Sequence, residues 1–453
     1  MDYTQITAEQ RTRMLEAIGV ADPADLFRSM PKRFRLERPL NLPPALSELE
    51  LQAELARRLP AAGTTADLTC FMGGGAYDHF IPTVVNDVAG KGEFLTAYTP
   101  YQAEASQGSL QAFFEFQTQV ARLTGLDAAN ASLYDGATAA AEAVFMALNV
   151  TGKRRVIVSA GVHPQYRAVL RTSCSDLPVT LIELEADAKC GLTPAAAIEA
   201  AVDDDTAAVV VQSPNVFGLI EDWAGAFAAA KGKGALSIAV FNPIAAALLK
   251  RPGSCGADVA VGEGQPLGIP LQYGGPWLGL FAARSALMRK MPGRLIGQTT
   301  DKSGRRAFCL TLQTREQHIR GAKATSNMCT NQGLLAIRAT TYLTLMGASG
   351  LRGVAERCWH KAHHAARLIA RLPGYCLPHG DSPFFHEFVV NCPVPAERIV
   401  EAGRKAGSLP GVPLRRLGIG GENQLLIAVT EKRTAADIDR LVALLAESRS
   451  ETR

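Results

Sequence analysis

Short runs of β-branched residues alternate with alanine-rich stretches between residues 66 and 320, and this alternation constrains the fold more than any other feature of the sequence. Strands that are apolar along their whole length and separated by helices predict a largely parallel sheet with helices on both faces. Such sheets bind ligands at the carboxyl ends of their strands. Six runs have this strand pattern: RRVIVSAG, PVTLIELE, TAAVVVQSP, ALSIAVFNP, ADVAVGEG and WLGLFAA.

Prolines and the order of elements divide the chain into three predicted parts. Residues 1–65 form an N-terminal helical and extended arm, in which Thr7 caps a helix that ends at Gly19 and the prolines of RPLNLPPALSE prevent a regular helix. Residues 66–346 hold the predicted sheet and form the large domain. Residues 347–453 read as helix, strand, helix, strand, helix, which predicts a smaller C-terminal α+β domain.

Charge and composition exclude several classes of protein. The 47 Lys and Arg residues against 43 Asp and Glu leave a net charge of +4, which gives no electrostatic reason to expect a nucleic-acid partner. The longest apolar stretch, 235–249, is interrupted and is shorter than the ~20 residues of a membrane span. The start, MDYTQITAEQ, lacks the pattern of a secretory signal, so we expect a cytosolic protein. Nine Cys residues without a C-x-x-C pair predict free thiols and no metal.

The segment Tyr134–Thr138 has the features of an anion site. Gly136, Ala137 and Thr138 open an alanine-rich helix, where backbone N–H groups, a hydroxyl and the positive helix end suit a phosphate. The alternative is an ordinary capped helix. His163 follows the strand RRVIVSAG, where an imidazole could stack on a flat heterocycle. The alternative is that this His has only a structural role.

A pyridoxal-phosphate enzyme would also need a pyridinium partner and a Schiff-base Lys on the following strands. Asn242 stands at the first position, and an amide cannot stabilise a pyridinium charge. The segment ADVAVGEGQPLGIPLQYGGP contains no Lys, and Gln265 occupies the place where one is expected. Lys250 lies before that strand and is a poor substitute. A self-sufficient aminotransferase or decarboxylase using Lys250 or Lys323 stays open as an alternative.

Several long blocks resemble the P-protein family of the glycine cleavage system, the glycine decarboxylases, and in particular subunit 1 of its two-subunit form. The resemblance runs nearly end to end and is carried by these segments: MLEAIGV, FMGGGAYDHFIP, EFLTAYTPYQAEASQGSLQAFFEFQT, NASLYDGATAAAEA, PGSCGADVAVGEGQPLGIPLQYGGPWLG, LTLQTREQHIRGAKATSNMCTNQ and LLIAVTEKRT.

The resemblance implies a fold of the type-I pyridoxal-phosphate enzymes and an α2β2 assembly with subunit 2. In that family the Schiff-base Lys belongs to subunit 2, so Gln265 within GEGQPLG fits a chain without a covalently bound cofactor of its own. The whole enzyme would decarboxylate glycine, release carbon dioxide and pass the aminomethyl group to the lipoyl arm of the H-protein. Asn242 departs from the acidic residue expected there. A non-catalytic scaffold subunit is the remaining alternative.

Two segments have the chemistry to line the partner's active site, and an inter-subunit surface is the alternative for both. The first, TAYTPYQAEASQG, contributes Tyr98, Tyr101, Gln102, Glu104 and Gln107. The second, LTLQTREQHIRGAKATSN, contributes Arg315, His318, Arg320, Lys323, Thr325 and Ser326, with Gly321 as a hinge.

Two further motifs have weaker functional signals. FMGGGAYDHF predicts a tight turn or a close backbone approach, because no helix pattern follows its glycines; Asp78 and His79 adjoin there without a nucleophile. His360, His363 and His364 share one helix face, but we expect no zinc because the helix supplies no further Cys or carboxylate at ligand spacing beyond Cys358.

Overall fold

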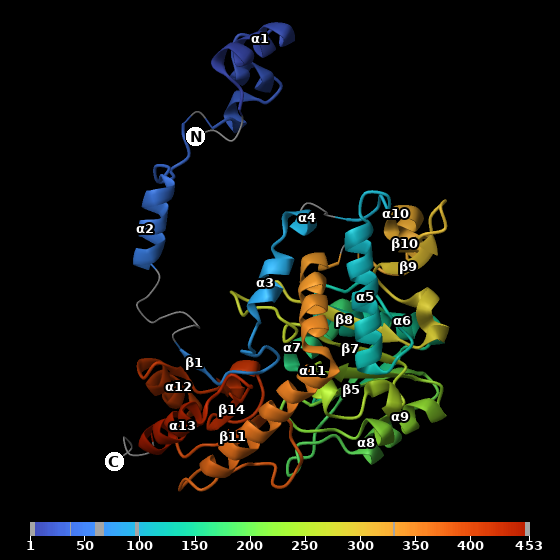
Figure 1. Cartoon of the computed structure of the whole chain (residues 1–453), viewed down its shortest axis with the longest axis vertical. Coiled ribbons are helices and arrows are strands. Elements are labelled where there is room, and N and C mark those ends of the chain that lie inside the picture. The colour runs from blue at the N-terminus through green and yellow to red at the C-terminus, as the bar shows by residue number, and fades with distance from the viewer. Residues whose placement is uncertain (1–4, 37, 59–67, 96–98, 329–330, 449–453) are drawn as a thin grey trace. The chain divides into compact units, whose positions relative to one another are not determined.

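The structure is a computed structural model that describes residues 5–36, 38–58, 68–95, 99–328 and 331–448 (Figure 1). Its contacts divide the chain into two compact units, Met1–Ala61 and Ala62–Arg453. No helix in these described ranges is long and apolar enough to cross a membrane.

The N-terminal unit consists of short helices without a buried core. The predicted cap is confirmed: Thr7 and Gln10 form a reciprocal capping box, and Gly19 ends the helix at a φ of 79°. No side chain of residues 5–36 and 38–58 is buried. The elements are α1 (Ala8–Ile18), η1 (Pro23–Phe27), η2 (Lys32–Phe34) and α2 (Glu48–Arg58).

The second unit is built on a mostly parallel sheet of seven strands among the described residues, in the order β2-β8-β7-β6-β5-β3-β4. Strands β3 to β7 run parallel, whereas β8 is antiparallel to both of its neighbours. The prediction of a largely parallel sheet is confirmed. The strands are β2 (Ala128–Ala129), β3 (Arg155–Ser159), β4 (Thr180–Leu184), β5 (Thr206–Ser213), β6 (Leu236–Phe241), β7 (Val259–Glu263) and β8 (Gly279–Ala283).

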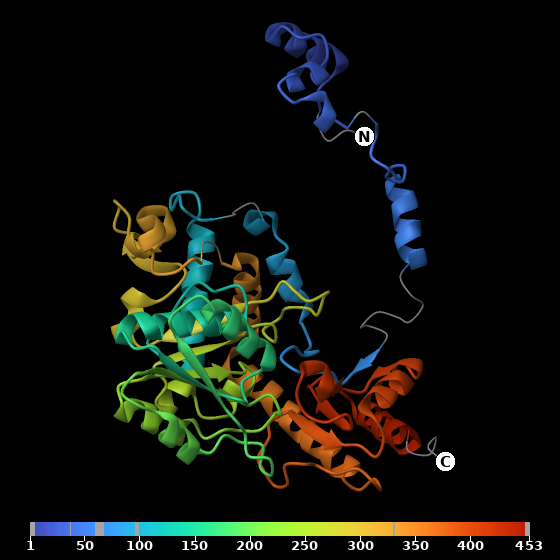
Figure 2. The same ribbon diagram turned by 180° about the vertical axis from the view of Figure 1, so that it is seen from behind.

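Helices cover both faces of this sheet because successive strand residues point to opposite sides. Val209 and Val211 of β5 pack with α5, α8, α9 and α11, whereas Ala208 and Val210 pack with α6 and α7. Figure 1 shows α5 and α11 in front of the sheet, and Figure 2 shows the opposite face. The helices are α5 (Gln107–Thr124), α6 (Gly136–Thr151), α7 (Pro164–Cys174), α8 (Ala195–Ala201), α9 (Trp223–Gly232) and α11 (Gly333–Ile369), which breaks at Gly347.

Shorter elements connect the sheet to the rest of this unit. Strands β9 (Leu295–Thr300) and β10 (Arg306–Thr311) form an antiparallel hairpin that the sequence analysis did not predict. The other connecting elements are α3 (Thr83–Ala89), α4 (Gly92–Leu95), η3 (Ala245–Ala247), η4 (Pro252–Cys255), η5 (Ser285–Lys290), η6 (Gln313–Arg315), α10 (Gln317–Arg320) and η7 (Gly321–Lys323).

The C-terminal part is the predicted smaller α+β element, with a three-stranded antiparallel sheet of order β11-β14-β13. Its core also receives Phe71, because the short strand β1 (Thr69–Cys70) pairs with β12 (Ser408–Leu409). The predicted boundaries at residues 65 and 346 stay predictions. The remaining elements are β11 (Glu387–Asn391), α12 (Ala396–Lys405), β13 (Val412–Pro413), η8 (Leu414–Leu417), β14 (Gln424–Ala428) and α13 (Ala435–Ser448).

Candidate functional site

The start of helix α6 lies at the carboxyl ends of the parallel strands, and its polar groups already have partners within the chain. Asp135 caps the helix by accepting from the Thr138 amide at 2.7 Å, while the Thr138 hydroxyl accepts from the Asp135 amide at 3.1 Å. The Gly136 amide donates to Oε2 of Glu263 at 3.0 Å. Of the predicted phosphate-binding residues, Thr138 is therefore engaged in the helix cap and Gly136 in a bond to a carboxyl group.

Glu263 ends strand β7 and is held by both of its carboxyl oxygens. Its Oε1 accepts from the amides of Gln265 at 3.0 Å and Leu278 at 2.9 Å, and its Oε2 accepts from Gly136. Burial raises the pKa of Glu263 to about 7, although these three N–H donors act in the opposite direction. The sequence analysis missed this residue, although a Glu at the end of an otherwise apolar strand is itself a signal.

Both polar atoms of the Gln265 side chain are hydrogen-bonded to backbone groups. Its Oε1 accepts from the Tyr77 amide at 2.9 Å, and its Nε2 donates to the carbonyls of Tyr77 at 3.0 Å and Ile269 at 2.9 Å. The side chain is buried. Asn242 likewise serves local structure, because its Oδ1 accepts from the amides of Ile244 and Ala245.

His163 is fixed by the glycine-rich segment rather than being free to stack on a ligand. Its Nδ1 accepts from the Gln165 amide at 3.2 Å, so Nε2 carries the proton that bonds to the Gly74 carbonyl at 2.9 Å. Burial lowers the pKa of His163, which favours this neutral form.

The segment FMGGGAYDHF makes the close backbone approach that its glycines predict. A Cβ at Gly73 would lie 2.0 Å from Oε1 of Glu387, and the Gly74 amide donates to the same oxygen at 2.6 Å. The Tyr77 hydroxyl donates to Oε2 of Glu387 at 2.9 Å. Burial raises the pKa of Glu387 to about 7. This segment thereby joins the C-terminal sheet to the site.

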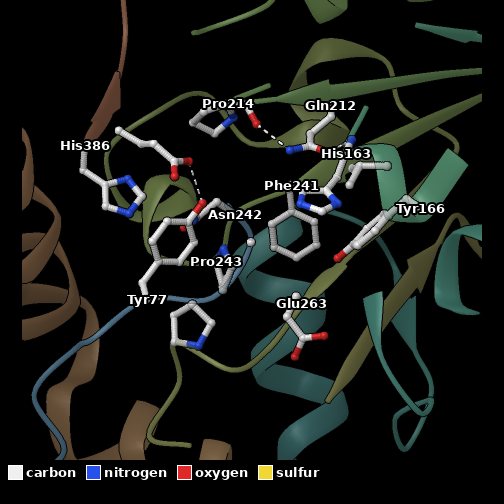
Figure 3. A pocket seen from close by; sticks show the side chains of 14 residues that line it. Tyr77, His163, Tyr166, Gln212, Pro214, Phe241, Asn242, Pro243, Glu263 and His386 are labelled. Atoms are coloured by element: carbon white, nitrogen blue, oxygen red, sulfur yellow. Dashed lines mark hydrogen bonds between the residues drawn. The ribbon is translucent and has the colours of Figure 1, made fainter. Parts of the chain in front are cut away.

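The cavity left between these groups is small. It has a volume of about 40 Å³, compared with the ~300–1,000 Å³ of typical cofactor and ligand pockets. Figure 3 shows Tyr77, Phe241 and Tyr166 around this space, with Glu263 on the side of α6. The inner cavity is too small for pyridoxal phosphate, and the Gly136 amide that a phosphate would need donates to Glu263 instead.

A second polar group gathers residues from both predicted lining segments around a buried Arg. The Tyr101 hydroxyl accepts from Nη2 of Arg294 at 3.0 Å, and the Tyr101 and His318 rings lie 5.3 Å apart. Glu316 lies 3.9 Å from Nε of Arg294, too far for a hydrogen bond. Within the described residues, Nε and Nη1 of Arg294 have no hydrogen-bond partner although the residue is 3% exposed. The sequence analysis did not select Arg294.

The other predicted lining residues have separate positions. Gln107 bonds to the backbone of Phe308 in β10, and Arg315 donates to the carbonyls of Met291 and Gly293. Thr325 donates its amide to the Arg315 carbonyl, and the Ser326 hydroxyl accepts from the Met328 amide. Tyr98 lies outside the described residues. The exposed members are Gln102, Glu104, Arg320 and Lys323, and Lys250 is exposed as well.

The three predicted histidines of α11 do not form a metal-ligand cluster, but His79 lies close to two other residues with ligand-type atoms. His363 donates to the Trp359 carbonyl and stacks on Phe384, while His360 and His364 are exposed. His79, Cys358 and Glu431 place ligand-type atoms within 4.8 Å of one another. However, Nδ1 of His79 and Oε2 of Glu431 are 2.7 Å apart, a hydrogen-bond distance shorter than the ~3.3 Å that two ligands at ~2 Å from one zinc ion would have.

The fold and the position of the pocket define the class: this is an α/β protein of the type-I pyridoxal-phosphate enzyme fold. A sphingosine-1-phosphate lyase from Burkholderia pseudomallei shares that fold with a TM-score of 0.65 at 16% identity, over 94% of this chain and 96% of that chain. A crystal structure of glycine decarboxylase, the P-protein of the glycine cleavage system, in inhibitor-bound form, matches with a TM-score of 0.91 at 45% identity, over 99% of this chain and 100% of that chain.

The family model for the glycine cleavage system P-protein matches residues 1–445. A relative in Prosthecochloris aestuarii named probable glycine dehydrogenase (decarboxylating) subunit 1 is 49% identical over 444 residues, 98% of each chain. One of the same name in Thermomicrobium roseum is 47% identical over 449 residues, 99% of this chain and all of the other. The chain belongs to the P-protein family of the glycine cleavage system, which confirms the resemblance read from the sequence.

Proposed function

We propose that this chain is subunit 1 of a two-subunit glycine dehydrogenase (decarboxylating). Together with subunit 2 it decarboxylates glycine, releases carbon dioxide and transfers the aminomethyl group to the lipoyl arm of the H-protein. The names of its relatives support the reaction. The observation that supports the dependence on a partner is the set of three hydrogen bonds that fix Gln265, the residue at the place where the sequence analysis expects a Lys.

In this proposal the cofactor is held covalently by subunit 2. Pyridoxal phosphate serves as an electron sink in such reactions. The exposed Lys250 and Lys323 both lie outside the cavity lining, which weakens the alternative of a self-sufficient enzyme. We place the complex in the cytosol, where free thiols such as those of this chain stay reduced.

The partner is subunit 2, in an α2β2 assembly. The N-terminal unit supports a large interface, because its helices expose apolar side chains that no core of that unit covers. Obligate interfaces are large and apolar. The exposed apolar side chains of this unit are Ile6, Met14, Ile18, Leu26, Phe27, Met30, Phe34, Leu36, Leu40, Leu42, Leu46, Leu49, Leu51 and Leu55.

The contribution of this chain to the shared site is assigned to the group of Tyr101, Arg294, Glu316 and His318. A buried guanidinium with unpartnered N–H groups is costly unless an acceptor completes it. Two free donors on one guanidinium suit a carboxylate. In the assembled enzyme we therefore expect this group to face the partner's active site and to help position an acidic group there, with Thr325 and Ser326 on the same segment.

Co-expression with subunit 2 tests this proposal. Arg294→Gln is expected to raise KM for glycine or lower kcat without preventing assembly, while Arg289→Gln, on the exposed side of η5, serves as the matched control. If Arg294→Gln assembles and has wild-type kinetics, the scaffold alternative is favoured and the lining role is rejected.

A further inference from the structure

We propose that the carboxyl group of Glu263 fills, from within the chain, the anion position at the start of helix α6, so that this subunit's pocket is closed to phosphate monoesters as well as to a covalently bound cofactor. The inference concerns the chain's own pocket and does not depend on the reaction of the complex.

The first argument is the use of the N–H donors. The start of a helix attracts anions because its first amides have no partner within the helix. The Gly136 amide donates instead to Oε2 of Glu263. The other oxygen is anchored by the amides of Gln265 and Leu278, so the carboxyl group is fixed at both ends and cannot swing aside without breaking these bonds.

The second argument is space. Gly136 leaves room for a close approach, and that room is taken by the chain: a Cβ built on Gly136 would lie 1.9 Å from the Tyr166 hydroxyl and 2.9 Å from the Glu263 amide nitrogen. The Thr138 hydroxyl, which could have been a further donor, is engaged with Asp135. The Gly136 amide, the Thr138 hydroxyl and the space next to Gly136 are therefore taken by groups of the chain.

The third argument is that a ligand could reach the start of helix α6 from a neighbouring hollow. A separate hollow of about 370 Å³ borders the same residues, and Asp135, Ala137, Tyr166, Glu263 and Trp277 are among those that line it. Because Glu263 lines both this hollow and the inner cavity, shortening its side chain would open the helix start to the hollow. The ligand class that would then fit is a phosphate monoester.

The test uses the full chain at pH 8, where the Glu263 carboxyl is ionised. Inorganic phosphate is compared with chloride at matched ionic strength by thermal unfolding, and pyridoxine 5′-phosphate, which lacks the aldehyde and cannot react with surface lysines, is titrated calorimetrically. For the wild type we expect no saturable binding. For Glu263→Ala we expect saturable binding of both probes, because three N–H donors are released.

Glu263→Gln is the matched control, since it keeps the volume and should remain closed. Glu263→Ser is a second opening variant in case Glu263→Ala does not fold. Saturable, mutually competitive binding of both probes to the wild type would overturn the proposal, and so would opening variants that keep the wild-type near-ultraviolet circular dichroism yet bind neither probe. If neither variant folds, the wild-type titration alone decides. These binding experiments use the single chain, so their outcomes do not depend on whether the complex decarboxylates glycine.

Discussion

Replacing Gln265 by Lys is expected to damage the fold rather than restore a cofactor site. The native amide accepts one hydrogen bond and donates two, all to backbone groups in a position that is 2% exposed. A Lys could still donate to the two carbonyls, but it leaves the Tyr77 amide without an acceptor, which costs about 1–3 kcal/mol. It also buries an ammonium group, so the total loss is about 3–5 kcal/mol of unfolding free energy.

The assay is urea unfolding followed by circular dichroism, together with the visible absorbance of the protein after incubation with pyridoxal phosphate. Gln265→Met is the control for the buried charge, because it loses all three hydrogen bonds without burying a charge, and it is expected to cost about 2–3 kcal/mol. A Gln265→Lys chain that is as stable as the wild type and forms a Schiff base with pyridoxal phosphate would refute the reasoning, because the pocket would then have room for the cofactor.

The remaining predictions concern a glycine, pH and the second polar group. Gly73→Ala should lower the unfolding temperature and cost about 2–4 kcal/mol of unfolding free energy, because its Cβ would lie 2.0 Å from Oε1 of Glu387. The control Gly108→Ala, whose Cβ would have no atom within 4 Å, should be neutral or stabilising. Equal effects of the two substitutions would contradict the steric argument. Glu221, Glu263 and Glu387 have folded pKa values raised from 4.5 to about 7, so each stabilises fully below pH 4.5 and loses up to about 3 kcal/mol as pH rises through 7. Unfolding free energy should therefore fall between about pH 4.5 and 7 and level off above pH 7. Glu387→Gln should reduce the slope in this range, and an unchanged slope would contradict the role of Glu387. Arg294→Lys, which keeps the charge but loses the fork of donors, should recover only part of the activity lost in Arg294→Gln.

The sheet could be predicted from the sequence because its strands are buried on both faces and so are apolar along their whole length. Strands β3, β5 and β6 are of this kind. The two-residue strand β2 is too short to show a pattern, and the β9–β10 hairpin was missed because polar residues dominate its turn and its partly exposed ends.

The absence of a Lys near Gln265 was visible in the sequence, but its structural consequence was not. The contacts that close the pocket join residues far apart along the chain: Glu263 with Gly136, Gln265 with Tyr77, and Gly74 with Glu387. No periodicity or local spacing encodes such pairs. Arg294 was missed for the same reason, because its burial beside Tyr101 and Glu316 depends on three separate segments.

The dependence of this chain on its partner is tested most directly by the exchange of labelled bicarbonate into the carboxyl group of glycine, measured with lipoylated H-protein. The proposal predicts exchange with the co-expressed pair of subunits and none with this chain alone. Exchange by the purified single chain, abolished by Lys250→Ala, would contradict it.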